Sequence, residues 1–221
     1  MLDLQNVSKS YNAGGGKVPA LHGLDLTLDR GDFLVAWGPS GSGKTTLLLM
    51  MGGMLTPDEG SVRFHGQDIY SWSSLRRNQY RRSSVGFVFQ RFFLVPHLNV
   101  RDNILMPASF NKDGARVHDR ATELAERLQL THRLDHYPSQ LSVGEQQRAA
   151  IARGLVCENE LILADEPTGN LDERNVDLIA RCFKEEQAAG RTLIVVTHDR
   201  VLLDIASRQV HLEAGHLVKQ V

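Results

Sequence analysis

The chain has 221 residues, 42% of them hydrophobic and 23% charged, which allows one sizeable core and excludes an intrinsically disordered protein. Its 25 basic residues against 26 acidic ones give a net charge of −1, so no basic surplus indicates a surface for nucleic acid. The sequence lacks zinc-site cysteine spacing, a secretory signal pattern and the apolar run of roughly 20 residues that a membrane-spanning helix needs. We therefore expect a cytosolic protein whose thiols, Cys157 and Cys182, are free, and any membrane it serves must be crossed by another chain.

Two stretches near the N-terminus, residues 2–7 and 24–28, alternate apolar with polar residues, which predicts half-buried strands of an antiparallel sheet. Residues 12–16 between them, Asn-Ala-Gly-Gly-Gly, are expected to form a mobile loop. Tyr11 precedes this loop. Its ring could stack on adenine at the edge of a nucleotide site, although a tyrosine is more often a packing residue.

Residues 38–45 match the phosphate-binding pattern G-x-x-x-x-G-K-[ST] at every specified position. An apolar run at 33–37 predicts a buried strand before the pattern, and residues 46–51 predict a helix after it, whose dipole favours an anion. In such a loop glycines let backbone N–H groups turn toward a polyphosphate, lysine adds positive charge and the last hydroxyl binds Mg²⁺. The sequence thus predicts a cradle for Mg·ATP, preceded by a core-filling Trp37 and made by Gly38, Pro39, Ser40, Gly41, Ser42, Gly43, Lys44 and Thr45.

The next stretch is predicted to hold a strand at 61–64, a turn at 65–68 and a buried strand at 84–89. Four arginines lie between the last two, and without a basic surplus they are interpreted as the solvated face of a helix: Arg76, Arg77, Arg81 and Arg82. Gln90 follows the strand at its carboxyl end. Ligands of open α/β sheets bind at such ends, although alone Gln90 would be an ordinary loop residue.

From Gln90 to Cys157 the sequence shows helical patterns without strand signals, which favours a helical subdomain inserted into an α/β core. Residues 117–128 have the spacing of an amphipathic helix. The apolar segment 91–96 is expected either to pack under the following helix or to face a partner. His132 and His136 stand four apart without the glutamate of a zinc-protease motif, so exposed histidines are expected.

Residues 141–148, Leu-Ser-Val-Gly-Glu-Gln-Gln-Arg, open another predicted helix, and Ser142 with Glu145 fits the S-x-x-E capping box. This helix presents a second exposed N-terminus, which can receive an anion. Because one phosphate cradle already exists, a second anion-receiving helix suggests that the γ-phosphate is held from two sides.

Two further apolar strands are predicted to deliver polar residues to the same edge of the sheet. The strand at 161–164 is followed by Asp165, placed to hold Mg²⁺ through its water shell, and by Glu166, placed to orient an attacking water. The strand at 192–197 is followed by His198, which we expect to contact the γ-phosphate.

With these elements in this order, the chain resembles the nucleotide-binding subunit of an ABC transporter over essentially all 221 residues. The segment Leu-Ser-Val-Gly-Glu discriminates, because a phosphate loop and an acidic strand end occur in many NTPases. The resemblance implies a single α/β domain: a P-loop NTPase (RecA-like) core with an N-terminal antiparallel β subdomain, at about 1–90 and 158–221. A helical subdomain is inserted at about 91–157.

The resemblance also implies roles for individual residues. Glu166 would be the catalytic base, His198 the switch histidine, and Lys44 and Gln90 would assist catalysis. The Mg²⁺ ligands would be Thr45, Gln90 and Asp165. The residues that bind ATP would be Tyr11, Gly38, Pro39, Ser40, Gly41, Ser42, Gly43, Lys44, Thr45, Thr46, Gln90, Ser142, Val143, Gly144, Glu145, Asp172 and His198.

The implied function is ATP hydrolysis by two copies packed head to tail around two ATP, driving a separately encoded membrane permease without nucleic acid. The subunit would lie peripherally on the inner face of the cell membrane. Residues 85–90 and 167–172 are similar to the subunits that drive lipoprotein release and macrolide export. Val143 departs from the more usual L-S-G-G-Q, and its β-branched side chain restricts the backbone there. Two alternatives are a soluble ABC-type ATPase acting on DNA or the ribosome, and a regulator that binds ATP without turnover.

Overall fold

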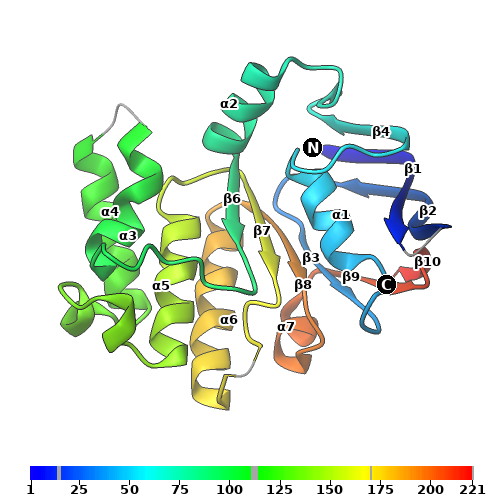
Figure 1. Ribbon diagram of the computed structural model, residues 1–221. Helices are drawn as coiled ribbons and strands as arrows, with labels where there is room; N and C mark the ends of the chain where they lie inside the picture. Colours follow the sequence, from blue (N-terminus) through cyan, green and yellow to red (C-terminus); the bar gives the residue numbers. More distant parts are fainter. Residues whose placement is uncertain (14–15, 111–113, 170, 221) are drawn as a thin grey trace.

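The computed structural model describes residues 1–13, 16–110, 114–169 and 171–220 (Figure 1). Its first sheet is antiparallel with the strand order β2-β1-β4-β5. The strands are β1 (Leu2–Ala13), β2 (Gly16–Leu28), β4 (Glu59–Phe64) and β5 (Gln67–Asp68). The predicted alternation is confirmed, since the apolar side chains of β1 are buried: Leu2, Leu4 and Val7.

Two predictions about this sheet need correction. The hairpin strands extend into the predicted loop, because Tyr11 pairs with Val18 and Asn12 with Lys17. Tyr11 is therefore a strand residue, and the rest of the predicted loop, residues 14–15, lies outside the described chain. The predicted turn at 65–68 ends in the short strand β5, which pairs with the end of β4.

The second sheet has six strands in the order β10-β9-β3-β8-β7-β6, parallel except for the pairing of β9 with β10. Four were predicted and are confirmed: β3 (Phe33–Trp37), β6 (Val85–Val88), β7 (Leu161–Asp165) and β8 (Thr192–Val196). The other two are β9 (Arg208–Glu213) and β10 (His216–Gln220). Trp37 is half-buried and stacks on His211 of β9 with ring centroids 3.9 Å apart, so it does not fill the core as expected.

The helices are α1 (Lys44–Met51), α2 (Ser74–Ser84), α3 (Val100–Leu105), α4 (Gly114–Arg127), α5 (Val143–Leu155), α6 (Glu173–Ala188) and α7 (Arg200–Ile205). Short 3₁₀ turns lie at Met106–Phe110, Thr131–Arg133 and Pro138–Gln140. Between β6 and β7 the described residues form helices and loops without a strand, so the helical insertion is confirmed. Its division at 91–157 stays a prediction. None of the helices within the described ranges has both the length and the apolar character to cross a bilayer.

Strand β3, which leads into the phosphate loop, lies between two apolar cores. Phe33 and Val35 contribute to a core that joins the sheet to α4, α5 and α6. Leu34 and Ala36 face the opposite core, which joins the sheet to α1 and the antiparallel sheet. Because successive side chains of a strand point to opposite faces, this strand is buried on both sides. The base of the phosphate loop is therefore rigidly held.

The amphipathic helix predicted at 117–128 is α4, and all of its predicted core positions are buried: Val117, Ala121, Leu124, Ala125 and Leu128. The prediction that the four arginines of α2 form one solvated face is wrong for two of them. Arg77 donates a 2.8 Å hydrogen bond to the carbonyl of Trp72, and Arg81 a 2.7 Å bond to that of Gly53. These carbonyls lie in loops outside regular ladders, so they attract the half-buried guanidinium groups.

Candidate active site

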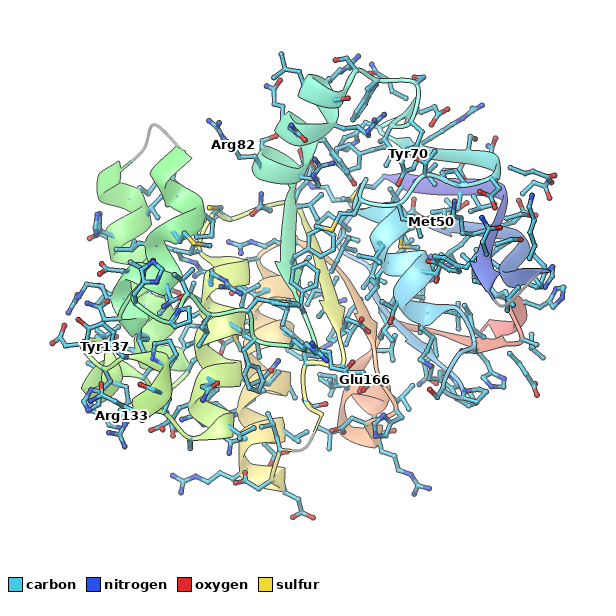
Figure 2. The ribbon with its side chains drawn as sticks, in the orientation of Figure 1. Met50, Tyr70, Arg82, Arg133, Tyr137 and Glu166 are labelled. Carbon is cyan, nitrogen blue, oxygen red and sulfur yellow. The ribbon has the colours of Figure 1, made fainter. Side chains whose placement is uncertain are left out.

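A cleft of about 710 Å³ lies where α1 begins beside the carboxyl ends of β7 and β8 and the β1–β2 hairpin. Glu166 is at the end of β7, near the middle of the molecule (Figure 2). The cleft is lined by Tyr11, Val18, Pro19, Ala20, Gly38, Ser40, Gly41, Ser42, Gly43, Lys44, Thr45, Thr46, Gln90, Asp165, Glu166, Val196 and His198. The structure thus brings together predicted site residues from five separate stretches of the sequence. Pro39 of the phosphate loop does not line the cleft and is exposed.

Two glycines give the phosphate loop its path. Gly38 has φ 149°, and a Cβ on it would lie 2.0 Å from the carbonyl oxygen of Leu212. Gly43 has φ 99°, and a Cβ there would lie 2.3 Å from the carbonyl oxygen of Ala20. Both positions therefore require glycine, for reasons of backbone conformation and of space. The loop runs close against β9 and β2 and then enters α1, where Leu47 N–H donates to the carbonyl of Gly43 at 2.9 Å.

Lys44 is held by its own loop. Its Nζ donates to the carbonyl oxygens of Gly38 at 2.9 Å and Pro39 at 2.8 Å, and lies 3.4 Å from Ser42 Oγ. Within the described ranges Lys44 forms no ion pair, so only neutral oxygens contact its charge. An ammonium group positioned in this way suits a polyphosphate, which would supply the anionic partner that the loop does not.

Thr45 and Asp165 make direct contact, with Thr45 Oγ1 donating to Asp165 Oδ2 at 2.9 Å. Burial and the charge of Glu166 raise the pKa of the Asp165 carboxyl above its usual value, although Thr45 and Lys44 act in the opposite direction. A half-buried carboxylate beside a hydroxyl is a hard oxygen set that fits Mg²⁺. No group of three or more histidine, cysteine, aspartate or glutamate side chains that could hold a metal ion occurs in the described residues.

Glu166 has an unusual backbone. Its φ of 44° is in the left-handed region, which costs a non-glycine residue on the order of 1–3 kcal/mol, and its N–H donates to the carbonyl of Val196 at 2.8 Å. His198 Nδ1 lies 3.3 Å from Glu166 Oε1 in hydrogen-bonding geometry and 3.2 Å from Oε2. The buried Oε2 has no hydrogen-bond partner among the residues that the structure describes. The backbone of Glu166 is therefore strained, and its carboxylate lies between His198 and the phosphate loop.

Tyr11 and Gln90 complete the rim of the cleft. The Tyr11 hydroxyl lies 3.2 Å from Thr46 Oγ1, which ties the β1–β2 hairpin to the start of α1. The ring remains partly exposed, as a stacking surface must be. Gln90 follows β6 and is exposed on the cleft wall.

The other predicted ATP-binding residues are not in this cleft. The start of α5 holds Ser142, Val143, Gly144 and Glu145. In Figure 1, α5 and α1 lie on opposite sides of strands β6 and β7. Arg133, which contacts Glu145, lies far from Glu166 in Figure 2. Glu145 and Asp172 line a separate cavity of about 280 Å³. A single copy therefore does not bring the start of α5 to its own phosphate loop.

The N-terminus of α5 has the predicted capping box. Ser142 Oγ accepts from Glu145 N–H at 3.3 Å, and Glu145 Oε2 accepts from Ser142 N–H at 2.8 Å. Arg133 Nε donates to Glu145 Oε1 at 2.7 Å. Burial alone would raise the pKa of the Glu145 carboxyl, but the hydrogen bonds from Ser142 and Arg133 lower it to about 2. Val143 is the first residue of α5, and its side chain is 53% exposed.

Three residues around this cap were not singled out from the sequence. Arg133 interacts with Glu145 and with His136, which is half-buried rather than exposed as expected. Arg148 donates to Asn175, whose amide donates to Asp172 Oδ1 at 2.8 Å. This chain of contacts joins α5 to the start of α6. No motif marks Asn175, whereas Arg148 lies within the segment that opens α5 and could have been considered.

The family model described as ABC transporter matches residues 21–169. The chain is 43% identical over 219 residues to the lipoprotein-releasing system ATP-binding protein LolD of Shewanella frigidimarina, covering 98% of this chain and 92% of that protein. It is 39% identical over 220 residues to the macrolide export ATP-binding/permease protein MacB of Marinobacter nauticus, covering 99% of this chain but 34% of that protein. A dimeric post-hydrolysis structure of the ATP-binding cassette MJ0796, bound to ADP and Pi, matches with a TM-score of 0.94 and 35% identity, over 100% of this chain and 98% of that one.

Proposed function

This chain belongs to the ABC transporter family, and from that premise we propose that it is the ATP-hydrolysing subunit of a lipoprotein-release or macrolide-export type of transporter. One observation carries the proposal: a lysine that forms no ion pair within the described residues, a Thr–Asp contact and a Glu–His contact share one cleft. These are the groups needed to bind a polyphosphate, hold Mg²⁺ and activate water.

ATP would lie along the cleft with adenine on the Tyr11 ring and its phosphates against the backbone of residues 38–46. Thr45, Asp165 and Gln90 would hold Mg²⁺, which neutralises charge on the phosphate oxygens when bound. Lys44 would turn from the loop carbonyls toward the β- and γ-phosphates. Its present partners are neutral oxygens, so this exchange replaces weak contacts with charge-assisted ones.

Glu166 would accept a proton from a water molecule while the water oxygen bonds to the γ-phosphorus. The bond from that phosphorus to the bridging oxygen of ADP breaks, and inorganic phosphate and ADP are the products. His198 would orient the Glu166 carboxylate and donate to the γ-phosphate, while Lys44 stabilises the charge that develops on its oxygens.

Each site would be completed by a second copy of the chain. The start of α5 lies away from the phosphate loop of its own copy, and Ser142 and Val143 are exposed there. In a head-to-tail dimer Ser142, Val143, Gly144 and Glu145 of one copy would face the γ-phosphate held by the other, with Asp172 beside them. Such an isologous interface forms two equivalent sites. The dimeric MJ0796 structure supports this arrangement.

The partner in the membrane would be a separately encoded permease, with this subunit peripheral on the inner face. The LolD relative is covered over 92% of its length, whereas this chain spans 34% of the MacB relative, which is named as both ATP-binding protein and permease. A soluble ABC-type ATPase on nucleic acid or the ribosome is disfavoured by these relatives and by the net charge of −1. A regulator without turnover is disfavoured by the Glu166–His198 contact.

The test is Glu166→Gln, which keeps the shape of the side chain and removes the base. We expect ATP binding to persist, steady-state phosphate release to fall at least about hundredfold, and an ATP-dependent dimer to accumulate on size-exclusion chromatography. Glu126→Gln, an exposed substitution on α4, is the matched control. Near-normal turnover by Glu166→Gln would disprove its assignment as the base.

A further inference from the structure

The first turns of α5 and α6 are joined by the side chain of Asn175. Figure 1 shows these two helices side by side, with both N-terminal ends at the lower edge of the view. Asn175 lies in the first turn of α6 and is half-buried. It does not line the nucleotide cleft, so the groups that bind Mg·ATP and activate water leave its role unexplained.

Three neighbours fix the amide group of Asn175, and these contacts are here called the Asn175 bridge. Its Oδ1 accepts a hydrogen bond from a terminal nitrogen of Arg148 in α5, and its Nδ2 donates to Asp172 Oδ1 at 2.8 Å. Gly144 of α5 packs directly against the same amide. A Cβ on Gly144 would lie 3.2 Å from Nδ2, 3.4 Å from Cγ and 3.5 Å from Oδ1 of Asn175. A larger residue at position 144 would therefore press on the amide.

The Asn175 bridge is separate from the capping of either helix. Asp172 is the N-cap of α6, and its Oδ1 accepts from the backbone N–H of Asn175 at 2.8 Å. Any residue except proline supplies that N–H, so the cap of α6 does not depend on an asparagine side chain. The cap of α5 is formed by Ser142 and Glu145. The side chain of Asn175 is therefore not needed for either helix to begin, but it connects the two helix ends.

Arg148 supports the bridge from the second turn of α5. It lies four residues after Gly144, which places the two on the same face of the helix. Burial lowers the pKa of the Arg148 guanidinium, whereas the charges of Glu145 in α5 and Asp172 at α6 oppose that effect. The arginine thus lies in the field of one carboxylate from each helix end, and its hydrogen bond goes to the neutral amide of Asn175. Asn175 is the group through which Arg148 reaches α6.

We propose that Asn175 is a positioning residue that holds the start of α5 against the start of α6, so that Gly144 and Asp172 meet the ATP of the second copy as one rigid surface. Without the bridge the two segments would have to be ordered separately when the copies associate, which costs conformational entropy. The second copy is supplied by the proposed function, on which this inference rests. The bridge itself rests on contacts within one copy.

The bridge is tested first in the monomer without nucleotide. Asn175→Ala removes both side-chain hydrogen bonds, and the higher helix propensity of alanine offsets part of that loss, so the urea unfolding midpoint should change little. We expect hydrogen exchange of the backbone amides of residues 145–147 to become at least about tenfold faster, while exchange in α1 stays the same. Asp177→Ala, an exposed change on α6, is the control. Wild-type exchange at residues 145–147 of Asn175→Ala would overturn the proposal.

The effect on recognition is measured as ATP-dependent dimerisation in the Glu166→Gln background, in which ATP is retained. Asn175→Ala should raise the ATP concentration for half-maximal dimerisation about tenfold, and the ATP affinity of the monomer should stay within about twofold. This split between dimer and monomer would not follow from a general loss of stability. Unchanged dimerisation would contradict the positioning role. If Glu166→Gln alone forms no ATP-dependent dimer, the proposed function fails, and the exchange experiment still decides whether the bridge holds α5.

Gly144→Ala tests whether Asn175 acts through Gly144. The added methyl group points at the amide of Asn175, so in the Glu166→Gln background it should displace that amide and weaken dimerisation about tenfold. When Asn175→Ala is already present the space is free, and Gly144→Ala should weaken dimerisation further by less than about twofold. Such non-additivity is expected when two residues act through one contact. An equal effect of Gly144→Ala with and without Asn175→Ala would show that Asn175 does not position Gly144, and would overturn the proposal.

Discussion

The nucleotide cleft and the start of α5 both present an N-terminal end of a helix, but they are stabilised in opposite ways. At the cleft the helix end is formed by backbone that only glycine permits, and its charged residue, Lys44, contacts neutral oxygens. At α5 the helix end is capped by side chains, and its charged residue, Glu145, is paired with Arg133. The cleft therefore offers a positive charge that an anionic ligand can pair with. At the start of α5 the charged side chain is already paired, and the helix end presents an exposed surface. The comparison suggests that the first carries the chemistry and the second recognises a ligand already bound by another copy.

Ser142→Asp tests whether the start of α5 recognises a ligand bound by another copy, and it should have a large effect. Aspartate caps a helix about as well as serine, so α5 should remain intact. It adds a negative charge where the γ-phosphate of the other copy is expected, and we predict that ATP-dependent dimerisation and steady-state hydrolysis both fall at least about hundredfold. ATP affinity of the monomer, measured by titration calorimetry, should stay within about twofold. Ser139→Asp, an exposed change in the preceding turn, is the control; an equally active Ser142→Asp variant would place the α5 end outside the site.

Lys44→Ala tests whether the cleft carries the chemistry. We predict that it weakens ATP binding roughly 30-fold, the loss expected for hydrogen bonds from a charged donor, and abolishes measurable turnover. Mixing it with Ser142→Asp should restore activity, because in a mixed dimer one site has an intact cleft and an intact α5 end. With random assembly, half of the dimers are mixed and one of their two sites is intact, so about a quarter of the wild-type rate should return. A mixture that stays inactive would indicate that each copy completes its own site.

The cleft could be predicted from the sequence because its determinants are local. The phosphate-loop pattern, the apolar strands before Asp165 and His198, and the rule that parallel strands end at one edge together predict which residues meet. The strain at Glu166 and the tie between Tyr11 and Thr46 could not be predicted, since they depend on how separate segments pack.

The surroundings of the α5 end were less predictable than the cleft, because they depend on contacts between separate segments of the chain. The S-x-x-E pattern identifies the cap, but Arg133 comes from a different turn and its role depends on the tertiary fold. Trp37 and His211 meet only because β9 pairs with β3, and the carbonyls that bind Arg77 and Arg81 lie in loops. A sequence pattern can indicate the hydrogen bonds that a segment forms within itself, such as a helix cap. The contacts of Arg133, Arg77 and Arg81 join different segments of the chain, so no local pattern predicts them.

The charge pair at α5 predicts a dependence of stability on pH. The pKa of Glu145 is about 2 in the folded protein against 4.5 as the ordinary value, so its carboxylate stabilises the fold above pH 4.5. That contribution, about 3 kcal/mol at most, is lost as the pH falls from 4.5 toward 2. We predict that Glu145→Gln is less stable than the wild type at pH 7 in urea unfolding and that the gap narrows on acidification. Glu126→Gln should show no such pattern, and a gap that is constant with pH would contradict the pairing.

The smallest effect is expected for Val143→Gly, which changes the α5 end and leaves the cleft untouched. Because the Val143 side chain is 53% exposed, removing it should lower the free energy of unfolding by less than about 1 kcal/mol, mainly through the helix propensity of glycine. Without the β-branched side chain the backbone can approach the γ-phosphate of the other copy more closely. We therefore predict that the ATP concentration for half-maximal dimerisation, measured by light scattering, falls about two- to fivefold, a gain of at most about 1 kcal/mol. Unchanged ATP affinity of the Val143→Gly monomer would locate that gain in recognition, whereas tighter binding by the monomer would contradict the division of the site between two copies.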